Sequence, residues 1–165
     1  MESEDGTLAI VYNGELYNFQ DLRRELVSFG HVFHTECDTE VVLKAYQHWD
    51  SGCLTRFNGM FAFAVWNKKD STLFLARDFI GEKPLYYYVD DDSIIFASEI
   101  KAILANPTVP RRISYRGMSN FLSFGHSVAP KTIYENIFKL PSGHFMQVRK
   151  GRYQIHQYWD VGSML

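Results

Sequence analysis

The sequence predicts a single α+β domain built largely from antiparallel strands, and three observations lead to this prediction. Predicted β-hairpins follow one another with helices segregated between them, which is typical of α+β folds and not of parallel doubly wound sheets. Aromatic residues, 13 Phe, 10 Tyr and 3 Trp, are spread along the chain and favour packed sheets over a helical bundle. At 165 residues and 46% apolar composition, the chain can bury one sizeable core.

The first elements follow from hydrophobic periodicity. Residues 8–12, Leu-Ala-Ile-Val-Tyr, form an apolar run that predicts a buried strand, and Asn13-Gly14 ends it. An amphipathic pattern over 19–29 then predicts a helix with Asn18 as its N-cap.

Three hairpins and three further helices are predicted after this helix. Residues 60–66 are apolar on both faces, which indicates a strand buried on both sides. In order, the predicted elements are a short strand at 31–35, a helix capped by Asp38 or Thr39 and ended by Gly52, a hairpin of 60–66 with 72–77, a hairpin of 85–89 with 94–97 joined across 90–92, helices at 98–104 and 114–124, and a hairpin of 144–148 with 153–158.

Composition excludes several classes of protein. The net charge is −2 and the Lys and Arg residues are scattered, so no basic surface for nucleic acid or an anionic membrane is predicted. No apolar stretch of about 18 residues and no secretory leader occur, which predicts no membrane span and a cytoplasmic protein. The two cysteines, Cys37 and Cys53, are therefore expected to be reduced thiols.

A metal site is not predicted. His31, His34 and His48 lie near Cys37 in the sequence, but their spacing suits no zinc ligand set. The strand predicted at 31–35 would also point His31 and His34 to opposite faces.

The Asn13-Gly14 pair allows two interpretations. An Asn carboxamide and a Gly N–H at the end of a strand can both donate to one oxygen, which is the geometry of an oxyanion hole. Asn-Gly is equally a common tight-turn dipeptide, so these two residues alone also fit a plain turn.

A series of motifs runs through nearly the whole chain. They are NGELYN at 13–18, CDTE at 37–40, RFNGMFAF at 56–63, LARD at 75–78, GEKPLYY at 81–87, FASEIKA at 96–102, KLPSGH at 139–144 and YWD at 158–160. In this order they resemble the glutaminase domain of glutamine-hydrolysing asparagine synthetases, which are class II glutamine amidotransferases of the N-terminal-nucleophile fold.

The resemblance implies a four-layer αββα sandwich of two mostly antiparallel sheets, incomplete at the amino terminus, with residues 1–165 forming a partial domain. In that family an amino-terminal cysteine attacks the side-chain amide of glutamine, and a later arginine binds the substrate carboxylate. Both precede the strand that ends at Asn13, so we expect this chain to lack them and to be inactive alone. Cys37 and Cys53 match neither role, since neither has a predicted basic partner.

The resemblance also assigns site residues. Asn13 and the Gly14 N–H would stabilise the oxyanion, whereas Glu15 and Asp38 would hold the α-ammonium of glutamine. The alternatives are a solvated first-turn acid for Glu15 and a helix N-cap for Asp38, which could serve both purposes. The Arg77-Asp78 pair is expected to be structural, shaping a loop near the neighbouring synthetase domain.

Partners and cofactors follow from the same resemblance. This domain needs no cofactor, whereas ATP and Mg²⁺ belong to an absent synthetase domain that converts aspartate to asparagine. The expected partners are glutamine, that ATP-dependent synthetase domain in the full-length protein, and a second copy in a homodimer. Two alternatives stay open: a non-catalytic scaffold or interaction domain of an asparagine synthetase relative, and an amidotransferase acting on a sugar phosphate or ribosyl pyrophosphate. The Tyr-Asn after Glu15 favours the asparagine branch over the latter.

Overall fold

The computed structural model describes residues 1–91 and 93–164, and these form two compact units. The first unit comprises residues 1–83 with the described residues from 143 onward, and the second comprises residues 84–142. Asp92, in the turn predicted at 90–92, and Leu165, at the end of the predicted domain, lie outside the described residues.

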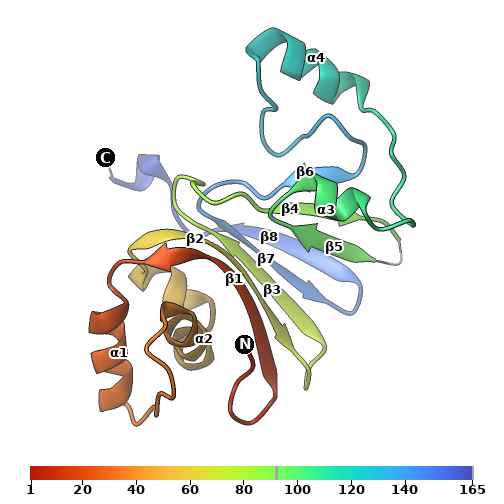
Figure 1. The fold of residues 1–165 in the computed structure, drawn as a ribbon. Helices are drawn as coiled ribbons and strands as arrows, with labels where there is room; N and C mark the ends of the chain where they lie inside the picture. Colours follow the sequence, from red (N-terminus) through yellow and green to blue (C-terminus); the bar gives the residue numbers. More distant parts are fainter. Residues whose placement is uncertain (92, 165) are drawn as a thin grey trace. The chain divides into compact units, whose positions relative to one another are not determined.

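The first unit is built on a five-stranded antiparallel sheet (Figure 1). Its strands, in spatial order, are β1 (Leu8–Leu16), β2 (Gly59–Asn67), β3 (Thr72–Arg77), β7 (His144–Arg149) and β8 (Arg152–Gln157). The hairpins predicted at 60–66 with 72–77 and at 144–148 with 153–158 are confirmed. Strand β2 is buried on both faces, as its unbroken apolar run predicts.

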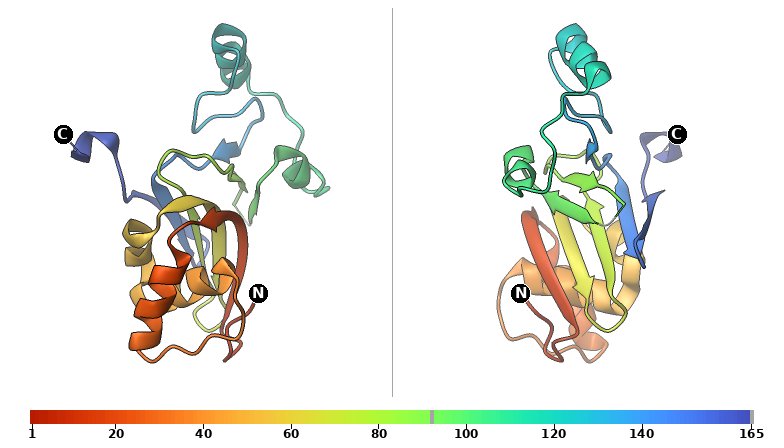
Figure 2. Two further views of the ribbon diagram at one scale, coloured as in Figure 1. Left: turned by 60° about the vertical axis from the view of Figure 1, so that its left-hand side comes forward. Right: turned by 90° about the vertical axis from the view of Figure 1, so that its right-hand side faces the viewer.

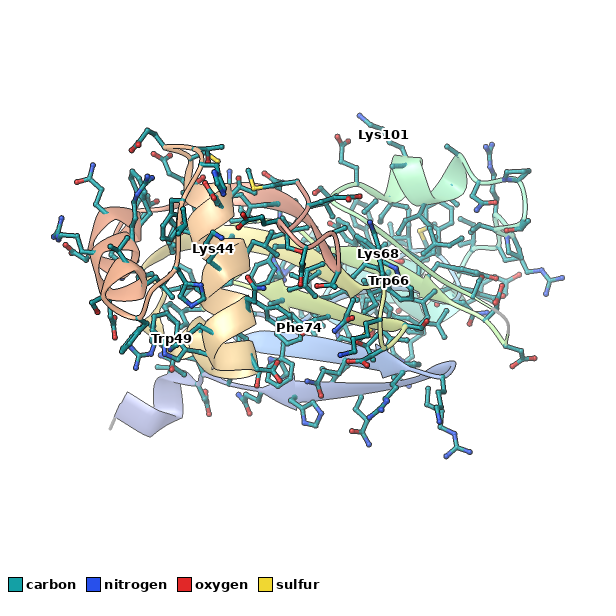
Figure 3. The ribbon with its side chains drawn as sticks, turned by 90° about the horizontal axis from the view of Figure 1, so that it is seen from below. Lys44, Trp49, Trp66, Lys68, Phe74 and Lys101 are labelled. Atoms are coloured by element: carbon teal, nitrogen blue, oxygen red, sulfur yellow. The ribbon has the colours of Figure 1, made fainter. Side chains whose placement is uncertain are left out.

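Two helices and a 3₁₀ helix cover one face of this sheet (Figure 2). They are α1 (Phe19–Ser28), α2 (Asp38–Trp49) and η1 (Asp50–Arg56). Figure 3 shows α2 lying across the strands of the sheet. Tyr46 of α2 packs on Phe74 of β3, with ring centroids 4.8 Å apart. Leu22 and Leu26 of α1 enter the same core, so the middle of the predicted amphipathic face is buried, whereas Phe29 at its end is exposed.

The second unit holds a three-stranded antiparallel sheet and two helices. Its elements are β4 (Tyr86–Val89), β5 (Ile94–Ala97), β6 (Ile137–Lys139), α3 (Ile100–Leu104) and α4 (Tyr115–Phe124), with the strands in the order β5-β4-β6. The hairpin of β4 with β5 and both helices were predicted, and Ser114 caps α4 by accepting the Gly117 N–H at 3.1 Å. Strand β6 was not predicted, because three residues are too few to show a period.

Several local predictions are wrong. Strand β1 continues through Asn13 and Gly14 to Leu16, so the Asn-Gly pair is not a tight turn and Glu15 is not in a helix. Residues 31–35 form no strand, since the Glu40 carboxylate accepts the backbone N–H groups of His34 and Thr35. The helix predicted to reach Gly52 ends at Trp49 and continues as η1.

Capping also differs from the prediction at two helices. Cys37, not Asp38 or Thr39, is the N-cap residue of α2. Asn18 is the N-cap of α1, but its side chain bonds to the Arg56 carbonyl and the Asn58 N–H at 2.9 and 3.0 Å instead of to the helix. Asn18 therefore ties the end of β1 to the entry of β2.

No helix in the described part of the chain has both the length and the apolar character needed to cross a membrane.

Candidate active site

The outer edge of β1 carries the Gly14 N–H. Ile10 exchanges both of its backbone hydrogen bonds with Met1, and the Leu16 N–H donates to a side chain, so at both residues the N–H points away from β2. Backbone groups alternate between the two sides of an antiparallel strand, and the pairing of β1 with β2 has no bulge between these residues. The Gly14 N–H therefore points outward on the same edge.

Glycine is required at position 14 for a steric reason. A Cβ there would lie 2.3 Å from the Met60 carbonyl oxygen and 2.8 Å from the Phe61 Cα, both on the backbone of β2. Gly59 is equally confined, because its Cβ would lie 2.3 Å from the Glu15 carbonyl oxygen. These two glycines let the strands approach closely, and Gly14 brings its N–H to the edge without a turn.

Asp38 meets the same edge from the first turn of α2. Its Oδ2 accepts the Leu16 N–H at 3.0 Å and the Tyr12 hydroxyl at 3.0 Å. Tyr12 lies on β1 and is half-buried against the core. Its pKa is raised, first by burial and then by the Asp38 charge, so the hydroxyl keeps its proton and remains a donor. Asp38 is thus anchored to β1 and does not cap its own helix.

Asn13 and Glu15 lie on the other face of β1. The strand alternates between buried residues such as Ile10 and Leu16 and exposed ones, among them Val11, Asn13 and Glu15. The exposed face is opposite to the helices. The structure therefore brings Gly14 and Asp38 to one strand edge and sets the Asn13 and Glu15 side chains beside it, open to solvent.

The Arg77-Asp78 pair is structural. Asp78 is 1% exposed, and its carboxylate accepts four backbone N–H groups, from Phe61, Gly81, Glu82 and Lys83. The buried Arg77 guanidinium donates to the Lys83 carbonyl at 2.7 Å and to the Gly81 carbonyl. The two side chains thus hold the loop at 78–83 against β2, next to the residue that pairs with Gly14.

The two cysteines lie in different environments. Cys53 is fully buried, and burial raises the pKa of its thiol, which disfavours the thiolate. Cys37 lies beside α2, where its Sγ is 3.0 Å from the Thr35 hydroxyl. His31 and His48 contact each other through ring nitrogens 3.0 Å apart, and no group of three or more metal-binding side chains occurs among the described residues.

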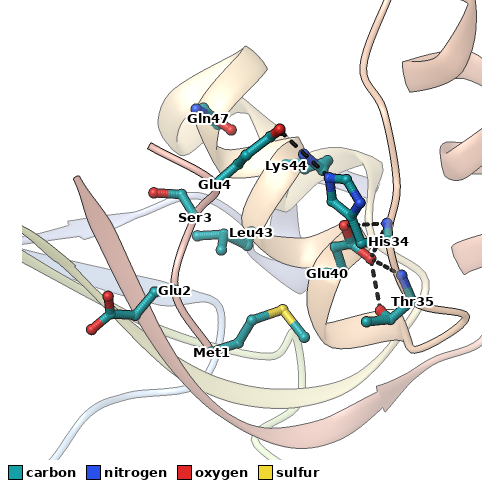
Figure 4. A pocket seen from close by; sticks show the side chains of 10 residues that line it. All are labelled: Met1, Glu2, Ser3, Glu4, His34, Thr35, Glu40, Leu43, Lys44 and Gln47. Atoms are coloured by element: carbon teal, nitrogen blue, oxygen red, sulfur yellow. Dashed lines mark hydrogen bonds and ion pairs between the residues drawn. The ribbon is translucent and has the colours of Figure 1, made fainter. Parts of the chain in front are cut away.

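A cavity of about 160 Å³ lies between the first residues of the chain and α2 (Figure 4). His34, Glu40 and Lys44 are among the residues that line it, and Glu40 points to the loop before α2, where it accepts the Thr35 hydroxyl and N–H at 2.7 Å. None of Asn13, Gly14, Glu15 and Asp38 lines this cavity. These four residues lie instead on β1 and at the start of α2.

Comparison with known proteins defines the class of this chain. Residues 1–159 match the family described as a glutamine amidotransferase domain, and the chain belongs to that family. It is 44% identical over 158 residues to asparagine synthetase [glutamine-hydrolyzing] 3 of Bacillus subtilis, covering 95% of this chain and 26% of that protein. It is 35% identical over 164 residues to a putative asparagine synthetase [glutamine-hydrolyzing] 2 of Methanocaldococcus jannaschii, covering 97% of this chain and 31% of that protein.

Within this class, the chain is a glutamine amidotransferase domain of the asparagine synthetase family. It spans about a quarter to a third of the length of these relatives and aligns with their amino-terminal part. Among solved structures, it resembles a glutamine phosphoribosylpyrophosphate amidotransferase from B. subtilis, with a TM-score of 0.66 and 20% identity over 96% of this chain and 31% of that one. This likeness shows the fold alone, and it confirms the predicted N-terminal-nucleophile amidotransferase fold with its two antiparallel sheets.

Sequence reasoning missed the part that Tyr12 and the Leu16 N–H play around Asp38. Tyr12 directly precedes Asn13, but within an apolar run it has the appearance of a core residue. The signal that points to Tyr12 is the two-residue repeat of a strand. Tyr12, Gly14 and Leu16 are two residues apart, so their N–H groups point to the same edge of β1, and the side chains of Tyr12 and Leu16 lie on the same face.

Proposed function

We propose that this chain carries the oxyanion-stabilising and ammonium-binding residues of a site that hydrolyses glutamine to glutamate and ammonia. Asn13 and the Gly14 N–H donate to the oxyanion that forms when the side-chain amide is attacked. Asp38 and Glu15 bind the α-ammonium group, since a cation held at a protein surface needs carboxylate partners.

The observation that carries this proposal is the spacing along the edge of β1. The Gly14 and Leu16 N–H groups point to the same side, two residues and thus roughly 6.6 Å apart. The Asp38 carboxylate receives the second of them at 3.0 Å. In glutamine, four single bonds separate the amide carbon from the α-nitrogen, about 5 Å when extended. One glutamine lying along this edge reaches both the oxyanion donors and the carboxylate.

The nucleophile is the second part of the proposal. Cys53 is buried with a raised pKa, and Cys37 has no basic partner among its described contacts, so neither cysteine attacks glutamine. Consequently the chain by itself has no glutaminase activity. In the whole protein, the ammonia serves the synthesis of asparagine, the activity that the names of the relatives describe.

The isolated chain tests the assignment of the cysteines. We expect no ammonia release from glutamine above the level of a heat-denatured sample, and no change with Cys37→Ser or Cys53→Ala. Ammonia release that Cys37→Ser abolishes would identify Cys37 as the nucleophile and contradict this part of the proposal.

Kinetics test the oxyanion and ammonium assignments, in this chain joined to the nucleophile-bearing segment that the family implies. Asn13→Ala should lower kcat by a factor of about 10²–10³ and change the glutamine KM by less than about tenfold. The reason is that the carboxamide donates to a negatively charged substrate oxygen only in the transition state. Asp38→Asn should chiefly raise KM, since it weakens ground and transition states alike.

A matched control for Asn13→Ala is Val11→Ala, because Val11 is exposed on the same face of β1. It should leave kcat and KM unchanged. If Asn13→Ala lowers the melting temperature while kcat per folded molecule stays intact, Asn13 is a structural residue and the proposed site is wrong.

A further inference from the structure

Both hydrogen bonds that anchor Asp38 to β1 end on the same oxygen. The Tyr12 hydroxyl and the Leu16 N–H each donate to Oδ2 at 3.0 Å, and the described residues provide no hydrogen bond to Oδ1. Two donors on one oxygen fix the rotation of a carboxylate and leave the other oxygen to accept from a ligand. The carboxylate is therefore oriented before any ligand binds.

The two donors differ in what a mutation can remove. The Leu16 N–H belongs to the backbone of β1 and is present with any residue except proline. The Tyr12 hydroxyl belongs to a side chain whose ring also packs against the core formed by the sheet and the helices. Replacing Tyr12 by Phe keeps the ring and deletes only the donor to Asp38.

We propose that Tyr12 is a positioning residue that orients the Asp38 carboxylate toward the α-ammonium group of glutamine. This inference rests on the proposed function, because it acts through the role assigned to Asp38. Without the hydroxyl, the carboxylate keeps one anchor and gains rotational freedom. The loss should weaken only ligands that carry the ammonium group.

The test is a titration of the chain itself, followed by shifts of its backbone amide NMR signals. The two ligands are L-glutamine and 4-carbamoylbutyrate, which is glutamine without its α-amino group. We expect glutamine to bind the native chain with a Kd weaker than about 1 mM, since it makes only a few hydrogen bonds. Tyr12→Phe should weaken glutamine binding about three- to tenfold and leave 4-carbamoylbutyrate unchanged.

Two further variants make the comparison specific. Tyr46→Phe is the matched control, because Tyr46 packs against the same core from α2 and has no hydrogen bond to Asp38 among the described residues. It should bind both ligands like the native chain. In the Asp38→Asn background, adding Tyr12→Phe should cause no further loss of glutamine affinity, since both substitutions remove the same interaction.

The outcomes separate this inference from the proposed function. If Asp38→Asn leaves glutamine binding unchanged, or if the native chain shows no shifts up to the solubility limit of glutamine, the proposed function fails and this inference with it. If Asp38→Asn weakens glutamine but Tyr12→Phe behaves like Tyr46→Phe, only the inference is overturned. Equal losses for both ligands in Tyr12→Phe would assign Tyr12 a purely structural role and overturn it as well.

Discussion

Replacing Asp78 by Asn perturbs the four hydrogen bonds that a buried carboxylate accepts. Its Oδ1 accepts the N–H groups of Gly81 and Glu82 at 2.6 and 2.9 Å, and its Oδ2 accepts those of Phe61 and Lys83 at 3.2 and 2.9 Å. An Asn carboxamide has one oxygen and one NH₂ group. In either orientation of the carboxamide, two of the four backbone N–H groups face its NH₂ group, which is itself a donor and cannot accept them.

The expected loss of stability follows from these bonds. A hydrogen bond to a charged group contributes about 1.5–3 kcal/mol, so losing two costs about 3–6 kcal/mol. Asp78 is 1% exposed, so water cannot replace the lost acceptor without opening the loop. For a domain of this size each kcal/mol lowers Tm by about 2–4 °C, which predicts a decrease of about 6–24 °C.

Urea and thermal unfolding followed by circular dichroism measure this effect. The control is Asp70→Asn, because Asp70 is exposed in the β2–β3 turn and accepts from one side chain, that of Asn67. Its free energy of unfolding should change by less than about 0.5 kcal/mol. If the free energy of unfolding of Asp78→Asn is within about 1 kcal/mol of that of the native chain, the four hydrogen bonds contribute less to stability than proposed and the reasoning is refuted.

Three further predictions concern stability. Gly14→Ala should lower the free energy of unfolding, measured in urea, by about 1–3 kcal/mol, because its Cβ would lie 2.3 Å from the Met60 carbonyl oxygen. The control Gly52→Ala should leave that free energy unchanged, since a Cβ at position 52 has no atom within 4 Å. Equal effects of the two substitutions would contradict the steric argument. Burial raises the pKa of Glu40, but bonds from neighbouring donors outweigh it and the net pKa is lowered, so this carboxylate stabilises the fold above its ordinary pKa of 4.5. The loss of stability in Glu40→Gln, measured by urea midpoints from neutral to acid pH, should therefore shrink as the pH falls below 4.5, and a constant loss would refute it. Asn18→Ala should lower the free energy of unfolding by about 1–2 kcal/mol, because two bonds to the β2 entry are lost, and an unchanged urea midpoint would show that these bonds contribute nothing.

Elements whose signals are local can be predicted from the amino-acid sequence. The hairpin of β2 with β3 follows from an apolar run, a polar turn at 67–70 and a second apolar run, all within 18 residues of chain. Helix α1 follows from the period of its buried residues, and the family follows from motifs read in order. Such signals depend on residues a few positions apart in the sequence, so they can be recognised without the tertiary structure.

Features that depend on residues distant in the sequence become visible only in the folded chain. Whether Asn13-Gly14 turns or continues as a strand depends on the backbone of β2, which lies where a Cβ of residue 14 would be. The N–H groups at 34 and 35 bond to Glu40 and not to a neighbouring strand, and β6 exists through its pairing with β4. The anchoring of Asp38 by Tyr12 joins residues 26 positions apart, and only the packing of α2 on the sheet brings that hydroxyl and that carboxylate together.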